Sequence, residues 1–207
     1  MNEIAVILPA YNEELTIKDT ILSFYNELPT ANIVVIDNNS KDMTSKIVKE
    51  TFLKHNINGT LLFEPRQGKG NAVRLAFKQV DAEIYVMADA DMTYPASYVN
   101  QLIEPIKDDN FDMVVGDRLS GGNYYKENKR PFHNSGNKLV RNMVNSFFNA
   151  EISDIMSGYR SFSRRFVKNY PILVEGFELE TDMTLHALDK RFNIKEIPID
   201  YKDRPEG

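Results

Sequence analysis

The sequence contains no cysteine, which excludes disulfides, a thiolate nucleophile and cysteine-ligated zinc. Its three histidines, His55, His133 and His186, are scattered and form neither a metal-binding pattern nor a catalytic triad. No apolar run is long enough to cross a bilayer, and no signal peptide opens the chain. These absences fit a cytoplasmic protein.

The net charge of −5 argues against a general nucleic-acid binder. The charge is unevenly distributed, because ten basic and three acidic residues between Arg118 and Lys168 give this segment +7 and leave −12 on the rest of the chain. Such polarity indicates an anionic partner on one side, such as a phosphate or a membrane surface. The alternative is a solvated basic face without a partner.

Short apolar runs alternate with amphipathic stretches through the first half of the chain. The expected strands cover residues 4–9, 32–37, 60–64, 83–88 and 113–117. The expected helices cover residues 15–28, 43–55 and 69–80, with another opened by Pro95. This order predicts an α/β fold with a mainly parallel sheet and helices on both faces. We expect a single domain over residues 1–207 and, because the chain stops just after a strand-like run at 194–199, a longer parent protein.

A different pattern follows residue 117. A polar loop at 120–130 precedes a helix whose apolar residues form one stripe: Leu139, Val140, Met143, Val144, Phe147 and Phe148. Our main interpretation is that this stripe belongs to the core. The flanking Lys138 and Arg141 allow a second interpretation, a helix lying on a lipid surface.

Polar residues follow three of the expected strands, at the edge where an open parallel sheet binds its ligands. They occupy residues 9–13, 37–40 and 89–91. Asp37 and Ser40 would also serve as ordinary helix caps. Three such clusters at one edge nevertheless indicate a binding site.

Asp89-Ala90-Asp91 is the most specific of these clusters. Residues i and i+2 of an extended turn project to the same side, so both carboxylates can face one ligand. Their hard oxygen atoms suit Mg²⁺ or Mn²⁺, and a cation bridging them to a diphosphate would stabilise the charge on a departing nucleotide. The alternative is a pair of solvated loop aspartates. The apolar strand directly before them favours the metal site.

Two common nucleotide-binding motifs are excluded. Gly68-Lys69-Gly70 begins like a dinucleotide fingerprint, but Val73 occupies the place of the third glycine, and the run follows the third strand rather than the first. No Walker A sequence occurs in the chain.

Seven stretches, in this order and spacing, resemble the family 2 glycosyltransferases of the GT-A fold, in particular the dolichyl-phosphate mannosyltransferases and the bacterial polyprenyl-phosphate glycosyltransferases. The matching stretches are Pro9-Ala10-Tyr11-Asn12-Glu13, Asp37-Asn38-Asn39-Ser40-Lys41-Asp42-Met43-Thr44, Gly68-Lys69-Gly70, Asp89-Ala90-Asp91, Gly116-Asp117-Arg118, Ser157-Gly158-Tyr159-Arg160 and Phe177-Glu178-Leu179-Glu180. The resemblance covers nearly the whole chain and implies a GT-A, Rossmann-like fold.

The resemblance also implies roles for individual residues. The expected donor-binding residues are Pro9, Tyr11, Glu13, Val35, Asp37, Asp89 and Ala90. Asp89 and Asp91 would bind the metal, with Asp91 as the main ligand. The expected catalytic residues are Asp91, Arg118 and Arg204, the two arginines approaching the diphosphate or the acceptor phosphate. The residues expected to hold the acceptor phosphate are Arg130, Ser135 and Arg160.

Two positions depart from the family pattern. Thr93 replaces a glutamine that is frequent in mannosyltransferase relatives, which weakens any assignment of the sugar. Asn38 and Asn39 replace an acidic residue and a glycine, which can alter contacts with the nucleotide base.

The family implies inversion at the anomeric carbon by one in-line displacement. A hydroxyl acceptor would need a general base, for which Glu178, Asp154 and Glu180 are candidates. Glu180 has the alternative role of orienting Arg160 or capping a helix. A lipid phosphate is already anionic and needs only positioning, and the +7 segment favours it.

We therefore expect a hexosyltransferase that uses a GDP- or UDP-sugar, Mg²⁺ or Mn²⁺ and a polyprenyl phosphate acceptor at the cytoplasmic face of a membrane. One alternative is transfer to a glycan hydroxyl. The other, from a different class of protein, is a nucleotide-sugar-binding module without catalysis.

Overall fold

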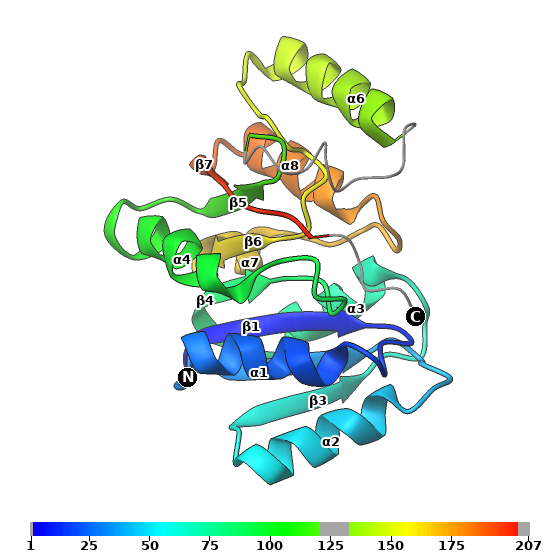
Figure 1. Ribbon diagram of the computed structural model, residues 1–207. Helices are drawn as coiled ribbons and strands as arrows, with labels where there is room; N and C mark the ends of the chain where they lie inside the picture. The colour runs from blue at the N-terminus through cyan, green and yellow to red at the C-terminus, as the bar shows by residue number, and fades with distance from the viewer. Residues whose placement is uncertain (1, 121–132, 203–207) are drawn as a thin grey trace.

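The computed structural model describes residues 2–120 and 133–202, and in this part of the chain seven strands form one sheet (Figure 1). The order across the sheet is β3-β2-β1-β4-β6-β5-β7. The strands are β1 (Asn2–Ala10), β2 (Asn32–Asp37), β3 (Gly59–Phe63), β4 (Ala82–Met87), β5 (Met113–Asp117), β6 (Arg160–Ser163) and β7 (Ile194–Pro198). β6 is antiparallel to its neighbours β4 and β5, and the other pairings are parallel. The predicted α/β fold with a mainly parallel sheet is confirmed.

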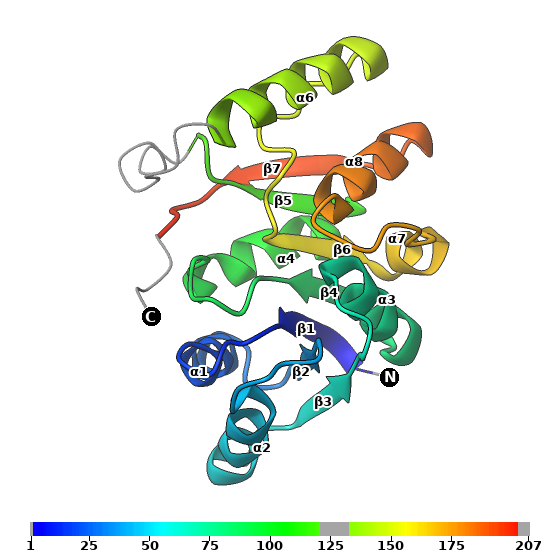
Figure 2. The ribbon, with the colours of Figure 1, turned by 90° about the vertical axis from the view of Figure 1, so that its right-hand side faces the viewer.

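Helices cover both faces of the sheet (Figure 2). One face carries α1 (Ile17–Glu27), α2 (Thr44–His55) and α4 (Val99–Asp108), and the other carries α3 (Lys69–Gln79), α7 (Arg164–Asn169) and α8 (Leu179–Asp189). A short 3-10 turn, Ala96–Tyr98, separates Pro95 from α4. α6 (His133–Phe148) lies outside these layers, beyond the β7 edge of the sheet (Figure 1).

The central strands are apolar on both sides because both faces of the sheet are covered. In β1, Val6 and Leu8 pack with α1 and α4, while Ala5 and Ile7 pack with α3. Successive side chains of a strand point to opposite faces, so one strand contributes to both hydrophobic cores.

The stripe of α6 is divided between core and surface. Val144 is buried against Ile152 and Ile155, with Val140 and Phe148 packed beside it. Its neighbours on the helix surface remain exposed: Leu139 by 64%, Met143 by 65% and Phe147 by 83%. The core interpretation is therefore right for one row of the stripe and wrong for the other. None of the helices in the described residues has the length and apolarity needed to span a membrane.

Candidate active site

The ends of three strands meet at one edge of the sheet, as the sequence predicts. β1 pairs with β2 so that Ala10 is opposite Asp37, and the backbone N–H of Ala88, just past β4, donates to the carbonyl of Ile7 over 3.2 Å. The segments that follow β2 and β4 therefore flank the segment that follows β1.

The loops after β1 and β2 are bound to each other through side chains. The backbone N–H of Asn12 donates to Ser40 Oγ over 3.0 Å, and the N–H of Lys41 donates to Asn12 Oδ1 over 2.8 Å. Asn12 adopts a left-handed φ of 54°, a conformation that asparagine tolerates better than most residues. These bonds fix the loop that carries Tyr11 and Glu13 against the loop after β2.

The Asp37 carboxylate binds the loop that follows β2 and the first turn of α2, whose N-cap is Met43. Its Oδ1 accepts the N–H of Ser40 over 2.9 Å, its Oδ2 accepts the hydroxyl of Ser45, and the residue is almost completely buried. Val35 is wholly buried in the core. Neither side chain reaches the surface, so the structure gives no support to the expected donor contacts of Asp37 and Val35.

The segment around Tyr11 is more open. Tyr11 is 45% exposed and Pro9 is half-buried, whereas Glu13 is buried and accepts the hydroxyl of Thr16 over 2.9 Å. Of the expected donor-binding residues that follow β1, Tyr11 is therefore the one with an accessible ring.

A buried ammonium group joins two carboxylates at the centre of the site. Lys69, the first residue of α3, contacts Asp89 Oδ1 and lies 2.5 Å from Glu180 Oε1 at the start of α8. Burial alone would lower the pKa of Lys69, but the two carboxylates outweigh it and hold the pKa above its usual range. Lys69 is therefore positively charged and fixes the orientation of Asp89. Glu180 forms its ion pair with Lys69, and its negative charge also acts on the buried guanidinium of Arg160.

The backbone packs tightly around this ion cluster. A Cβ atom on Gly158 would lie 2.9 Å from both Asp89 Oδ2 and Lys69 Nζ. The N–H of Gly158 donates to Tyr94 Oη over 2.9 Å, and burial raises the pKa of this phenol well above its usual range. Glycine is required at residue 158 because a side chain would displace the charged groups.

The two glycines around Lys69 have a related explanation. Gly70 donates its N–H to the carbonyl of Glu175 over 2.8 Å, and Gly68 has φ of 127° with room for no Cβ next to the same carbonyl. Gly68 and Gly70 therefore allow the loop before α8 to approach the start of α3, where Lys69 emerges. The sequence motif was visible, but its partner loop was not.

Asp91 is held in a tight turn. Its Oδ1 accepts the backbone N–H of Thr93 over 3.1 Å and the hydroxyl of Thr93 over 2.7 Å. Met92 between them has a left-handed φ of 64°, and the carbonyl of Ala90 accepts the hydroxyl of Thr20 over 3.0 Å. Asp91 is half-buried at the surface of the site, and Thr93 positions it.

Arg118 and Asp154 form a buried pair. Arg118 Nε and Nη2 donate to the two carboxylate oxygens of Asp154 over 2.7 and 2.9 Å, and Asp154 is fully buried. The guanidinium also lies 5.6 Å over the ring of Tyr201. Asp154 is thus committed to positioning Arg118, which argues against the role of a general base.

The assignment of Arg160 to an acceptor phosphate is wrong. Arg160 is fully buried and donates to the carbonyls of Ser157 and Ile155 over 2.8 and 2.7 Å and to Thr184 Oγ1 over 2.9 Å. Its guanidinium holds the turn before β6 and the middle of α8 together, with no surface left for a ligand.

Glu178 binds backbone rather than another side chain. Its Oε1 accepts the N–H groups of Glu175 and Gly176 over 3.3 and 3.1 Å. Hydrogen bonds from the backbone N–H of Glu178 itself, and then from those of Gly176 and Glu175, lower the pKa of the Glu178 carboxyl, which makes it a weaker base.

The basic segment is not one continuous basic face. Arg164 and Lys168 pair with Asp81, and Arg165 pairs with Asp112. Together with Arg118 and Arg160, five basic residues in the described part of this segment are bound by groups of the chain itself. Arg130 and Arg204 lie outside the described residues, as does the side chain of Ser135.

Among the described residues, no three histidine, cysteine, aspartate or glutamate side chains cluster as a ready-made metal site. Asp89 Oδ1 already faces an ammonium group, which disfavours a cation on the same oxygen. Asp91 is the better oxygen ligand of the pair.

The chain has a seven-stranded, mainly parallel sheet with charged loops at the ends of its parallel strands. This is a GT-A fold. Residues 5–170 match the family model described as Glycosyl transferase family 2, and the chain belongs to this family. The resemblance seen in the sequence is confirmed.

Two curated relatives and one solved structure illustrate the similarity. The glycosyltransferase AglJ of Haloferax volcanii is 28% identical over 99% of this chain and 64% of its own length. A dolichyl-phosphate hexose transferase of the same organism is 26% identical over 98% of this chain and 84% of its own length. Glucosyl-3-phosphoglycerate synthase from Mycobacterium tuberculosis, in complex with Mn²⁺, UDP and phosphoglyceric acid, superposes with a TM-score of 0.77 at 19% identity, covering 99% of this chain and 72% of that one. The chain thus spans less than two thirds of the length of AglJ.

Proposed function

We propose that this chain is an inverting hexosyltransferase that moves a sugar from a nucleoside-diphosphate sugar to a polyprenyl phosphate at a membrane surface. Membership in glycosyl transferase family 2 and the similarity to a dolichyl-phosphate hexose transferase support this class of reaction. The choice of acceptor depends on the carboxylates of the site.

The observation that carries the proposal is that each carboxylate considered as a general base already has another task. Glu180 is paired with buried Lys69, Asp154 with Arg118, and Glu178 with two backbone N–H groups. A hydroxyl acceptor would need one of them to accept a proton. A phosphate acceptor is anionic at neutral pH and needs positioning and charge stabilisation only.

On the donor side, Asp91 would hold Mg²⁺ or Mn²⁺, because its carboxylate is half-buried at the surface and fixed by Thr93. The cation would stabilise negative charge on the departing nucleoside diphosphate. Asp89, oriented by Lys69, would bind the sugar or ribose hydroxyls, and the exposed ring of Tyr11 would contact the base. Arg118, kept in place by Asp154, would face phosphate oxygens.

The donor half of this proposal can be tested by melting. UDP- and GDP-sugars are titrated with Mn²⁺, and a donor at a hundred times its dissociation constant should stabilise the fold by about 2.7 kcal/mol. Asp91→Asn should remove the Mn²⁺-dependent part of this shift and slow transfer about 100-fold or more. Asp19→Asn, the same change on the exposed surface of α1, is the control. Metal-independent binding without turnover would instead favour a binding module.

The acceptor half can be tested by a pair of variants. We expect Glu178→Gln to keep transfer to a polyprenyl phosphate and Arg130→Ala to weaken it. Melting curves show whether each variant remains folded. If Glu178→Gln abolishes turnover in a folded protein while Arg130→Ala does not, the acceptor is a hydroxyl and the phosphate proposal is wrong.

A further inference from the structure

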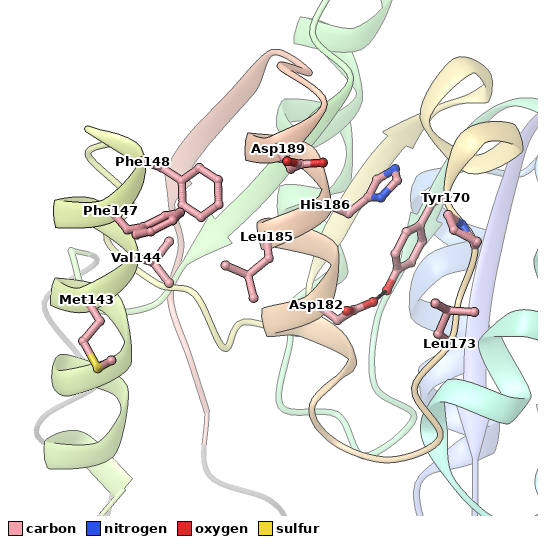
Figure 3. Close-up of a pocket in the computed structure, with 11 residues that line it drawn as sticks. Met143, Val144, Phe147, Phe148, Tyr170, Leu173, Asp182, Leu185, His186 and Asp189 are labelled. Atoms are coloured by element: carbon pink, nitrogen blue, oxygen red, sulfur yellow. Dashed lines mark hydrogen bonds between the residues drawn. The ribbon is translucent and has the colours of Figure 1, made fainter.

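A groove lies between α6, α8 and the segment that leads away from α7 (Figure 3). Its volume is about 600 Å³. Met143 and Phe147 border it from α6, Leu185 and His186 from α8, and Leu173 from the connecting segment. None of these residues belongs to the site at the ends of the strands.

The groove has an unusually apolar rim for a surface feature. Phe147 is 83% exposed and Leu173, on the opposite wall, is 81% exposed. Leu139 and Met143 continue the row of Phe147 along α6 at four-residue spacing, which places all three on one side of the helix. Exposed apolar side chains gathered in this way mark a surface that is covered by a partner.

The charges of the groove exclude an anionic occupant. Among the described residues that line it there is no lysine or arginine, and its ionisable groups are Asp182, Asp189, His186 and Tyr170. Asp182 accepts the hydroxyl of Tyr170 over 2.5 Å (Figure 3). Burial lowers the pKa of His186, which keeps the imidazole neutral near pH 7. A phosphate would meet carboxylates here, whereas an uncharged hydrocarbon meets methyl and aromatic groups.

Helix α8 connects this groove to the active site. Glu180, in its first turn, is paired with Lys69 beside Asp89. Leu185 and Asp189 follow five and nine residues later, which at 1.5 Å per residue is about 7.5 and 13.5 Å along the helix axis. The groove therefore begins within about two helical turns of the ion cluster at the sheet edge.

From this arrangement we infer that the groove holds the hydrocarbon chain of the acceptor while the acceptor phosphate lies at the sheet edge. The inference rests on the proposed function, because it divides one amphiphilic substrate between two surfaces of opposite character. The polar end lies near cationic Arg118, and the apolar end lies along the row of Met143 and Phe147. The affinity of the protein for prenyl phosphates should therefore depend on the length of the prenyl group.

The test compares farnesyl phosphate with the short dimethylallyl phosphate, measuring direct binding by calorimetry and transfer from the donor found by melting. We expect farnesyl phosphate to bind at least about tenfold more tightly, because several more apolar groups are buried. The double variant Met143→Ser/Phe147→Ser and, from the other wall, Leu173→Ser should each lose most of this preference. Leu53→Ser, at an 85% exposed leucine on α2, is the matched control and should retain it.

The outcomes separate the inference from the function on which it rests. The groove does not bind the hydrocarbon chain if both prenyl phosphates bind with equal affinity and accept sugar, or if the groove variants keep the preference for farnesyl phosphate. In either case the proposed function stands. If neither phosphate binds or accepts sugar although the donor binds, the proposed acceptor is wrong, and the inference with it. Length-independent binding combined with attachment to phosphatidylcholine vesicles would assign this surface to a bilayer. Length-independent binding combined with dimerisation would assign it to a second copy of the chain.

Discussion

The four-stranded region β3-β2-β1-β4 and the region around α6 both contain amphipathic helices, but they cover the apolar sides of these helices to different extents. α1 buries Ile17, Ile21 and Phe24 against the sheet, so its apolar side is fully covered. α6 buries Val144 but leaves Met143 and Phe147 in solvent. α1 lies on a broad sheet surface, whereas α6 lies beyond the last strand and packs against α8 and the segment around Ile152 and Ile155 (Figure 1). The number of neighbouring elements, rather than the helix pattern, decides how much of a stripe is buried.

The two regions also differ in the kind of residue whose burial is unusual. At the sheet edge, charged groups such as Lys69 and Glu180 are buried, and near α6 large apolar groups are exposed. Both arrangements are unfavourable for stability by themselves. Such departures gather where a protein binds its ligands, and here both adjoin one helix, α8, which carries Glu180 in its first turn and lines the groove with Asp182, Leu185 and His186.

The largest loss of stability is expected from removing the buried positive charge of Lys69 at the sheet edge. Lys69→Met would leave Asp89 and Glu180 buried without a cation, and we expect a loss of about 3–5 kcal/mol in the free energy of unfolding. Lys168→Met, which breaks a pair with Asp81 on the surface, should cost less than about 1 kcal/mol. Denaturant unfolding of both variants makes the comparison. Equal losses would mean that the ion cluster at the sheet edge is no more buried in solution than a surface pair.

A smaller effect is expected within α6 itself. Val144→Ala should cost about 1–2 kcal/mol, because it removes buried methyl groups and leaves a cavity. Met143→Ala, one residue earlier on the exposed row, should change stability by less than about 0.5 kcal/mol. The same unfolding measurement applies. A large loss for Met143→Ala would show that the exposed row is packed against protein and that the two regions are alike.

The smallest effect is expected in the pH dependence of stability, through His186 in the groove. Burial, and secondarily the charge of Lys190, lower the folded pKa of His186, while Asp182 and Asp189 oppose them. The unfolded chain therefore binds a proton more readily, so stability is full above the ordinary pKa of about 6.5 and falls as the pH drops below it. His186→Gln should flatten the pH dependence of the free energy of unfolding between pH 7 and 5, with His55→Gln as the control. An unchanged slope would mean that His186 is as solvated as a surface histidine.

Part of this structure was predictable from short stretches of sequence. The strands at 32–37 and 113–117 were predicted with the observed bounds, since continuous apolar runs between polar turns are a local signal. β6 was missed, because a four-residue strand that begins with Arg160 carries no alternating pattern. α7 was missed with it, as a helix of six residues has too few turns to show a periodicity.

The candidate site was predictable to the same extent. The clusters after β1, β2 and β4 were found because parallel strands carry their loops to one edge. The partners of Lys69 were not, since Asp89 and Glu180 come from segments 20 and 111 residues away in the chain, a pairing that no local pattern contains. The error at Arg160 has the same cause, because an arginine in a sequence is expected to be a surface cation, and its burial and its acceptors are known only from the structure.

The order of residues alone determined the α/β class, the placing of acidic and polar groups after the strands, and the family to which the chain belongs, because each depends on spacing along the backbone. Tertiary structure decided which of those polar and charged groups pair with one another and which side of α6 remains exposed. Burial and charge pairing depend on segments that are distant in the chain and meet only when the sheet has formed.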